Sequence, residues 1–166
     1  MRRSWLQENA HRRTGSGPHK TVKPAHVSVD WREDMYLEKI ASVCLLTRTD
    51  GRVLAISRGT DLLNLGLPGG KVEPGESRKH AAIRELREET GIIAEMAHTE
   101  LVYEAMNRDV FVSAFRVSKW KGTLIPAHDE GTPMWVYPEE LLTSYCVFRE
   151  FNYRVMQHAA SLLKLR

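Results

Sequence analysis

The stretch from Gly70 to Ile92 constrains this chain more than any other part of its sequence. It reads GKVEPGESRKHAAIRELREETGI, in which four glutamates and an arginine stand at fixed offsets behind a Pro-Gly-Gly turn. Pro74-Gly75 predicts a second turn, and the residues from Ser77 to Thr90 favour a helix that Gly91 ends as its C-cap. The sequence therefore predicts a glycine turn followed by a short, highly charged helix.

Three of these glutamates fall on one face of the predicted helix. Glu85, Glu88 and Glu89 stand at i, i+3 and i+4, so their carboxylates crowd together and repel one another. A hard divalent cation would neutralise them, and Mg²⁺ takes oxygen ligands and commonly binds substrate phosphates as well. Arg84 and Arg87 can hold or screen the carboxylates. The alternative is a solvated helix face with ordinary charge pairs, but the intact glycine turn favours a metal site.

The composition is that of one globular domain without a membrane segment. The chain has 166 residues, of which 42% are hydrophobic and 27% charged, enough for a real core. No apolar run is long enough to span a membrane. Cys44 and Cys146 stand in no metal-ligand spacing and fit a reducing compartment, so we expect a cytoplasmic protein. The histidines are scattered, and we expect no zinc site.

Positive charge is concentrated at the N-terminus. The net charge is +3, yet residues 1–29 alone carry six Lys or Arg against one Glu. We therefore predict a basic extension over residues 1–37 and a domain over residues 38–166. Three interpretations of the extension remain: a disordered or strapping segment, a contact to RNA or phosphates, and an organelle transit peptide, which ranks last because apolar periodicity is weak.

Hydrophobic patterning predicts strands on both sides of the charged helix. Asp50-Gly51 predicts a hairpin turn between the first two strands. Pro138 predicts the start of a helix. We expect a loop over residues 58–67. The expected strands cover Ile40–Thr47, Arg52–Ser57, Leu101–Tyr103, Val110–Val117 and Met134–Tyr137, with a turn over Trp120–Thr123 and a closing helix over Phe148–Leu165. Such mixed elements predict an α+β fold, an α/β/α sandwich.

The charged segment resembles the Nudix box, the signature of enzymes that hydrolyse nucleoside diphosphates linked to another group. Gly70, Glu76 and the run from Arg84 to Ile92 match its fixed positions. Over residues 38–163 the chain is similar to MutT-type nucleoside triphosphate pyrophosphohydrolases. The resemblance implies the Nudix fold, with a mixed central β-sheet between helices. It also implies that Mg²⁺ or Mn²⁺ supports hydrolysis of an ordinary or oxidised nucleoside triphosphate to monophosphate and pyrophosphate, and homodimers are common among relatives.

The resemblance implies roles for residues of the box. Glu85, Glu88 and Glu89 would bind metal, and one glutamate would deprotonate the attacking water. Arg84 would orient these carboxylates as part of the catalytic set. The remaining motif positions, Gly70, Glu76 and Gly91, would be structural.

Five residues outside the box resemble further site residues of the family. The Gly69 carbonyl and the Glu130 carboxylate would bind metal, and Glu130 would serve catalysis. Arg58 would contact phosphate, while Phe148 and Asn152 would bind the nucleobase. Each has a plainer alternative: a solvated loop acid for Glu130 (with Asp129 or Glu104 as substitutes), a strand end for Arg58, core packing for Phe148 and a backbone partner for Asn152.

Other functions remain open at this point. Relatives that hydrolyse ADP-ribose or dinucleoside polyphosphates often carry Pro or Tyr at a set distance past the box, and residues 108–110 contain neither. Removal of pyrophosphate from RNA 5′ ends is favoured by the basic extension alone. A non-catalytic nucleotide sensor would not need all three glutamates, so their presence argues for an enzyme.

Overall fold

The structure, a computed structural model, describes residues 40–125 and 131–164. The basic extension and Glu130 lie outside the described residues. The described elements in chain order are β1 (Ile40–Leu46), β2 (Val53–Arg58), β3 (Asp61–Gly66), β4 (Gly69–Lys71), α2 (Arg78–Thr90), β5 (Ile93–Ala94), η1 (Met96–His98), β6 (Thr99–Asn107), β7 (Val110–Val117), β8 (Trp120–Lys121), β9 (Pro133–Val136), η2 (Pro138–Leu142) and α3 (Arg149–Lys164).

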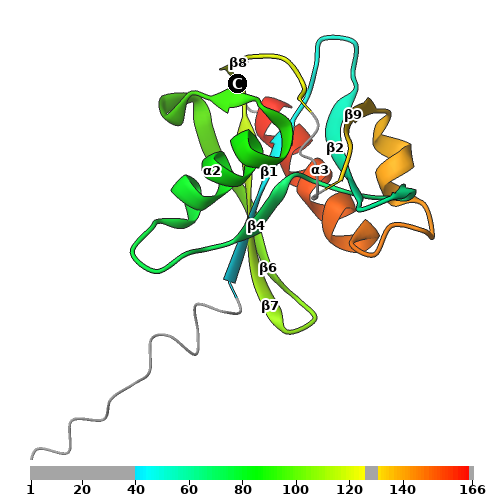
Figure 1. Ribbon diagram of the computed structural model, residues 1–166, viewed down its shortest axis with the longest axis horizontal. Helices are drawn as coiled ribbons and strands as arrows, with labels where there is room; N and C mark the ends of the chain where they lie inside the picture. The colour runs from blue at the N-terminus through cyan, green and yellow to red at the C-terminus, as the bar shows by residue number, and fades with distance from the viewer. Residues whose placement is uncertain (1–39, 126–130, 165–166) are drawn as a thin grey trace, which may run out of the picture. The chain divides into compact units, whose positions relative to one another are not determined.

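The strands form one mixed sheet and two smaller antiparallel sheets. In the first sheet the order is β4-β1-β7-β6, with β1 parallel to β7 and the outer pairs antiparallel. The second sheet has the order β3-β2-β9, and the third pairs β5 with β8. Figure 1 shows β2 and β9 beside the first sheet, on the side away from α2.

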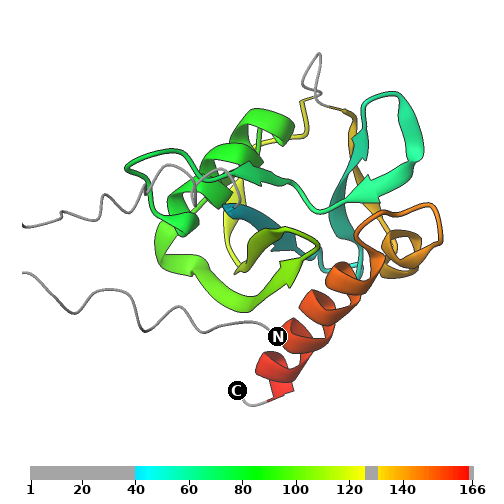
Figure 2. The same cartoon turned by 90° about the horizontal axis from the view of Figure 1, so that it is seen from below.

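The two helices cover opposite faces of the strands. Alternate residues of β1 point in opposite directions: Cys44 and Leu46 belong to the core under α2, whereas Leu45 belongs to the core under α3. Figure 2 shows α2 and α3 on either side of the strands. The expected α/β/α sandwich with a mixed central sheet is therefore confirmed. Within the described ranges, no helix has the length and apolar character to cross a membrane.

Two expectations about the strands were wrong. The expected hairpin has its turn, where the Gly51 N–H donates to the Arg48 carbonyl at 3.0 Å, but β1 and β2 are joined only by a bridge between Thr47 and Val53. Both edges of β1 are instead occupied by β4 and β7. Residues 58–67 were expected to be a loop, yet they contain β3. Its sequence, DLLNLG, lacks β-branched residues, so pairing with β2 outweighs local propensity.

Other boundaries differ less. β6 runs well beyond the expected Leu101–Tyr103, because all but one of its residues pair with β7. Two residues of the expected turn at Trp120–Thr123 form β8 instead. The helix that begins at Pro138 is a short 3₁₀ helix, while the closing helix is confirmed as α3.

Candidate active site

Caps and a buried stripe fix the position of α2. Ser77 accepts a hydrogen bond from the His80 N–H at 3.2 Å and caps the start. Gly91 ends the helix in the left-handed conformation, with φ at 76°, and its N–H donates to the Arg87 carbonyl. Ala82 and Leu86 are fully buried against the sheet. The carboxylates predicted to act together are therefore placed along a helix that cannot rotate without exposing its apolar stripe.

Arg84 joins the carboxylates of the box. Its Nε and Nη2 donate to the two oxygens of Glu76, at 3.2 and 2.7 Å. Its Nη1 donates to Glu85 at 2.8 Å and to Glu88 at 3.0 Å. Nη2 also donates to the Lys71 carbonyl at 3.0 Å, which ties the cluster to the end of β4. One planar guanidinium thus holds three carboxylates and a strand in a fixed arrangement.

The charges within this cluster shift the proton affinities of Arg84 and Glu76. Hydrogen bonding to Glu76 raises the pKa of Arg84, with Glu85 and Glu88 adding to the effect against partial burial. The same hydrogen bond lowers the pKa of Glu76, and a backbone donor at Glu73 lowers it further. Both groups are therefore charged at neutral pH.

Two glycines of β4 let Glu85 and Glu89 approach the strand. A Cβ at Gly70 would lie 2.5 Å from both Cδ and Oε1 of Glu85. The Gly69 N–H donates to Oε2 of Glu89 at 2.7 Å. Gly69 itself has φ at 152° and faces the backbone of Ser42 and Val43 so closely that no side chain fits. Glu85 and Glu89 therefore lie directly against the glycine turn.

Cys44 lies beneath this cluster but belongs to the core. Its side chain is fully buried, and its Sγ donates to the Ala82 carbonyl at 3.3 Å. Burial raises the pKa of the Cys44 thiol, and the charge of Glu89 raises it further. The sulfur therefore stays a protonated thiol that packs under α2, as the apolar run around it predicts.

The carboxylates offer only oxygen donors, which suits a hard divalent cation. The close approach of Glu85 to Gly70 also suits a metal site. It places the Glu85 carboxylate against β4, and the Gly69 carbonyl of that strand was predicted to bind the metal as well. In the part of the chain that the structure describes, no three His, Cys, Asp or Glu side chains already stand in a metal-binding arrangement. Instead, the Glu85 and Glu88 carboxylates accept hydrogen bonds from Arg84, and the Glu89 carboxylate accepts one from the Gly69 N–H.

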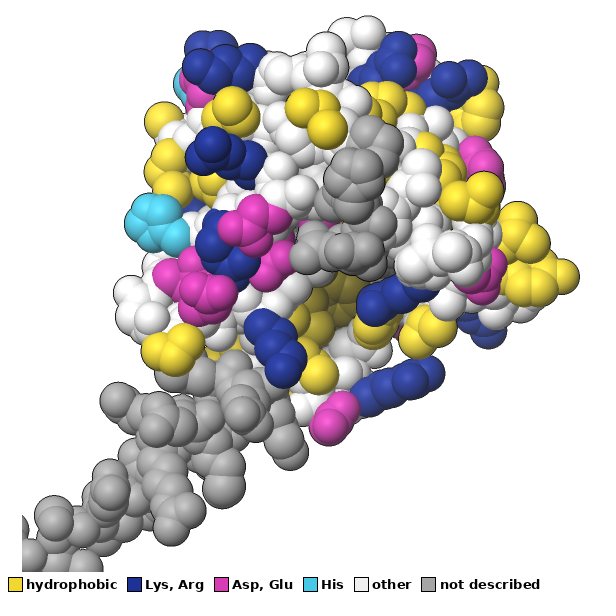
Figure 3. Space-filling view, in the orientation of Figure 1, with side chains coloured by type: hydrophobic (Ala, Val, Ile, Leu, Met, Phe, Trp, Pro, Cys, Tyr) yellow, Lys and Arg dark blue, Asp and Glu magenta, His cyan; other side chains and the backbone are white. Residues whose placement is uncertain are grey.

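The site lies on an accessible face of the molecule. A pocket of about 560 Å³ runs along the outer side of α2. Figure 3 shows the acidic and basic side chains of this region packed together beside a hollow. The pocket is lined by Glu76, His80, Ile83, Arg84, Arg87 and Glu88.

The predicted substrate-binding residues form a second group. The Arg58 guanidinium lies over the Phe148 ring, 4.7 Å from its centroid, so β2 and the start of α3 meet there. Asn152, one turn further along, donates its backbone N–H to the Phe148 carbonyl. Its side chain is 1% exposed and its amide donates to the Leu141 carbonyl at 3.5 Å. The structure thus brings Arg58, Phe148 and Asn152 together, on elements other than the helix that carries the glutamates.

Sequence reasoning missed the contacts that anchor the start of α2. Arg78 donates to Glu104 of β6 at 2.6 Å and to the buried Ser113 of β7 at 3.3 Å. Ser113 in turn donates to Glu104 at 2.7 Å. Glu104 was considered as a substitute metal ligand, but here it is the partner of Arg78. No local pattern could pair residues 26 positions apart.

Comparisons with known proteins show the family to which the chain belongs. The family model described as NUDIX domain matches residues 37–158. The CTP pyrophosphohydrolase of Escherichia coli strain K12 is 36% identical over 111 residues, which cover 64% of this chain and 82% of that protein. The MutT-like protein of Streptomyces ambofaciens is 31% identical over 105 residues, 63% of this chain and 68% of that protein.

Solved structures match the fold as well. The solution structure of the E. coli ORF135 protein has a TM-score of 0.55 and 30% identity, covering 74% of this chain and 91% of that one. A MutT structure from a study of the Aliivibrio salmonicida and Vibrio cholerae proteins has a TM-score of 0.58 and 25% identity, covering 73% and 96%. The chain belongs to the Nudix family, and it is a Nudix hydrolase.

Proposed function

We propose that this chain hydrolyses a nucleoside triphosphate to the monophosphate and pyrophosphate, with Mg²⁺ (or Mn²⁺) as the cofactor. The observation that carries the proposal is the Arg84 cluster, in which one guanidinium holds Glu76, Glu85 and Glu88 while Glu89 rests on the glycine turn. The triphosphate substrate class is supported by the similarity to a CTP pyrophosphohydrolase.

The chain's own residues supply positioning and charge. Glu85, Glu88 and Glu89 would hold the divalent cation, with the Gly69 carbonyl and Glu130 as further ligands. When bound, the cation would neutralise the diphosphate and lower the pKa of a water molecule. Arg84 keeps the carboxylates in place, and one of them accepts the proton of the attacking water. Glu130 lies outside the described residues, so its part in this set stays a prediction.

The second group would hold the rest of the substrate. Arg58 is a cation at the end of β2 and would contact phosphate. Phe148 offers a ring on which a base can stack, although in this structure Arg58 covers it. Asn152 is buried and bonded to Leu141, so base recognition by its amide would require that side chain to exchange partners.

The test is metal-dependent product release across a panel of substrates. The panel holds CTP, 8-oxo-dGTP, the ordinary dNTPs, ADP-ribose, diadenosine tetraphosphate and a 5′-triphosphate RNA. We expect Mg²⁺-dependent release of pyrophosphate from one triphosphate, and Glu88→Gln serves as the blank.

Each other outcome has a distinct meaning. Preferred hydrolysis of ADP-ribose, a dinucleotide or RNA would agree with the proposed roles of the catalytic carboxylates. It would contradict the proposed binding of the base by Phe148 and Asn152. Tight binding of one panel member without any turnover would contradict hydrolysis and leave a nucleotide sensor. Loss of turnover in Glu88→Gln with unchanged substrate binding would support the enzyme.

A further inference from the structure

Aromatic rings and arginines alternate on a surface that the catalytic residues do not use. The rings of Trp120 and Trp135 lie 6.0 Å apart between centroids and are tilted by 30°. Tyr137 follows two positions after Trp135, directly past the end of β9. We call Trp120, Trp135 and Tyr137, with Arg48 and Arg52, the aromatic strip.

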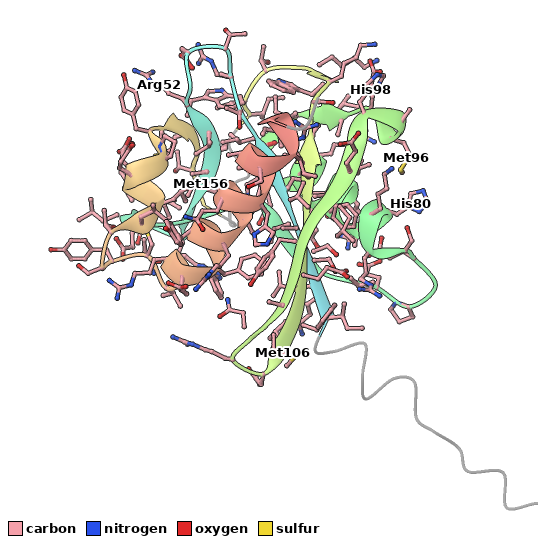
Figure 4. The ribbon with its side chains drawn as sticks, turned by 180° about the vertical axis from the view of Figure 1, so that it is seen from behind. Arg52, His80, Met96, His98, Met106 and Met156 are labelled. Carbon is pink, nitrogen blue, oxygen red and sulfur yellow. The ribbon has the colours of Figure 1, made fainter. Side chains whose placement is uncertain are left out.

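Each arginine of the strip lies over a ring. The Arg48 guanidinium is 5.4 Å from the Trp135 centroid, and the Arg52 guanidinium is 4.9 Å from the Tyr137 centroid. Arg48 also pairs with Asp50 at 3.2 Å. Arg52 makes no ion pair among the residues that the structure describes, and Figure 4 shows it at the start of β2, the middle strand of the second sheet. The strip therefore keeps positive charge beside its rings.

A pocket opens within the strip. Its volume is about 430 Å³, and it is lined by Arg48, Trp120 and Trp135 with Ile92 and Leu124. Pockets that bind small ligands measure about 300–1,000 Å³, so a single base fits here. None of the box glutamates lines this pocket, whereas Ile92 lies just past the end of α2. The pocket is therefore separate from the carboxylate cluster.

The chemistry of the strip matches one kind of partner. Proteins that bind single-stranded nucleic acid combine aromatic platforms, on which unpaired bases stack, with cations that follow the phosphates. Tyr137 is 53% exposed and the two tryptophans are half-buried. Arg48 lies over Trp135 and Arg52 over Tyr137, so a base that stacks on either ring would displace the guanidinium or use the other ring face.

We propose that the aromatic strip binds an unpaired segment of single-stranded nucleic acid, with one base in the tryptophan pocket and phosphates near Arg48 and Arg52. Tyr137 would stack a neighbouring base. This inference does not depend on which phosphoanhydride the enzyme hydrolyses, because none of these residues belongs to the catalytic set.

The test is direct binding of a labelled oligoadenylate by fluorescence anisotropy, using the full-length protein. The oligonucleotide has a 5′-hydroxyl group, so the catalytic site finds no phosphoanhydride. We expect Trp120→Leu and Tyr137→Leu each to weaken binding roughly five- to hundredfold, the range for losing one stacked base. Arg52→Glu should weaken it as well, and hydrolysis of the nucleoside triphosphate substrate should stay unchanged in all three variants.

The matched control is Arg108→Glu, the same charge reversal at an exposed turn residue. Arg108 lies in the turn between β6 and β7, two positions after Met106. Figure 4 shows Met106 far from Arg52. Equal losses in Arg52→Glu and Arg108→Glu would show general charge attraction and overturn the proposal. Unchanged binding in Tyr137→Leu and in Trp120→Leu would overturn it too, as would adenosine monophosphate competing as well as the oligonucleotide. Because Tyr137 is exposed, its variant remains informative even if Trp120→Leu fails to fold.

Discussion

Arg84 and Glu76 form a two-point ion pair, with nitrogen–oxygen distances of 2.7 and 3.2 Å. Their side chains are only 24% and 17% exposed, so water weakens this pair less than it weakens a surface salt bridge. Because the third nitrogen of Arg84 holds Glu85 and Glu88, the pair sets the position of the two carboxylates that we propose to be catalytic. We therefore propose that Glu76 acts through Arg84 and not on the substrate.

Glu76→Gln should lower activity by releasing Arg84. A neutral amide cannot hold the guanidinium at two points, and the loss of such a supporting partner costs about 10- to 100-fold in comparable sites. We expect the loss in kcat with little change in KM, measured by steady-state pyrophosphate release. Glu73→Gln is the control, because Glu73 reaches Glu76 through its backbone N–H. An equal loss in both variants would contradict the role of Arg84.

The same pair predicts how stability depends on pH. Arg84 lowers the pKa of Glu76 in the folded state below the ordinary value of 4.5. Stability from this carboxylate is therefore present above pH 4.5 and is lost as pH falls through the lower, folded-state value. Urea unfolding across this range should show the wild type losing more stability on acidification than Glu76→Gln. Parallel curves would contradict the assignment.

Gly70→Ala should damage catalysis more than folding. The added methyl would lie 2.5 Å from the Glu85 carboxyl carbon, so Glu85 must move. A displacement of about 1 Å in a catalytic group can cost about a hundredfold in rate. Gly66→Ala is the control, since a methyl there meets nothing within 4 Å. We expect kcat to fall in Gly70→Ala alone, while both variants keep a cooperative thermal transition. A normal kcat in Gly70→Ala would contradict the close approach of Glu85 to Gly70.

The sequence predicts α2 well, because the signals for this helix are local. Ser77 and Gly91 fix its ends, and residues at i, i+3 and i+4 must share a face. Pairing between distant residues is not local, which is why β3 was taken for a loop and β2 was assigned to the wrong partner. The bond from Arg78 to Glu104 was missed for the same reason. The resemblance to a family predicted substrate-binding roles for Arg58 and Phe148. Only the structure shows that the Arg58 guanidinium lies over the Phe148 ring.

Phe148→Ala should raise KM more than it lowers kcat. The ring is a platform under Arg58 in the group proposed to hold the base and a phosphate, away from the carboxylates. Losing one stacking surface costs about 1–3 kcal/mol, which corresponds to roughly five- to hundredfold in KM. Phe111→Ala removes a similar ring under Arg78, 5.3 Å from its guanidinium, and should leave KM unchanged. Equal KM values for Phe148→Ala and the wild type would remove Phe148 from the substrate site.

The most direct measurement follows pyrophosphate release from nucleoside triphosphates by the wild type and Glu88→Gln, with Mg²⁺ and with a chelator. We predict turnover that requires the cation and falls about a hundredfold or more in the variant, as expected when a proton-accepting or ligating carboxylate is lost. The fold of Glu88→Gln should be intact, since Glu88 is 54% exposed. Undiminished turnover in the chelator or in Glu88→Gln would contradict the proposed role of the α2 carboxylates.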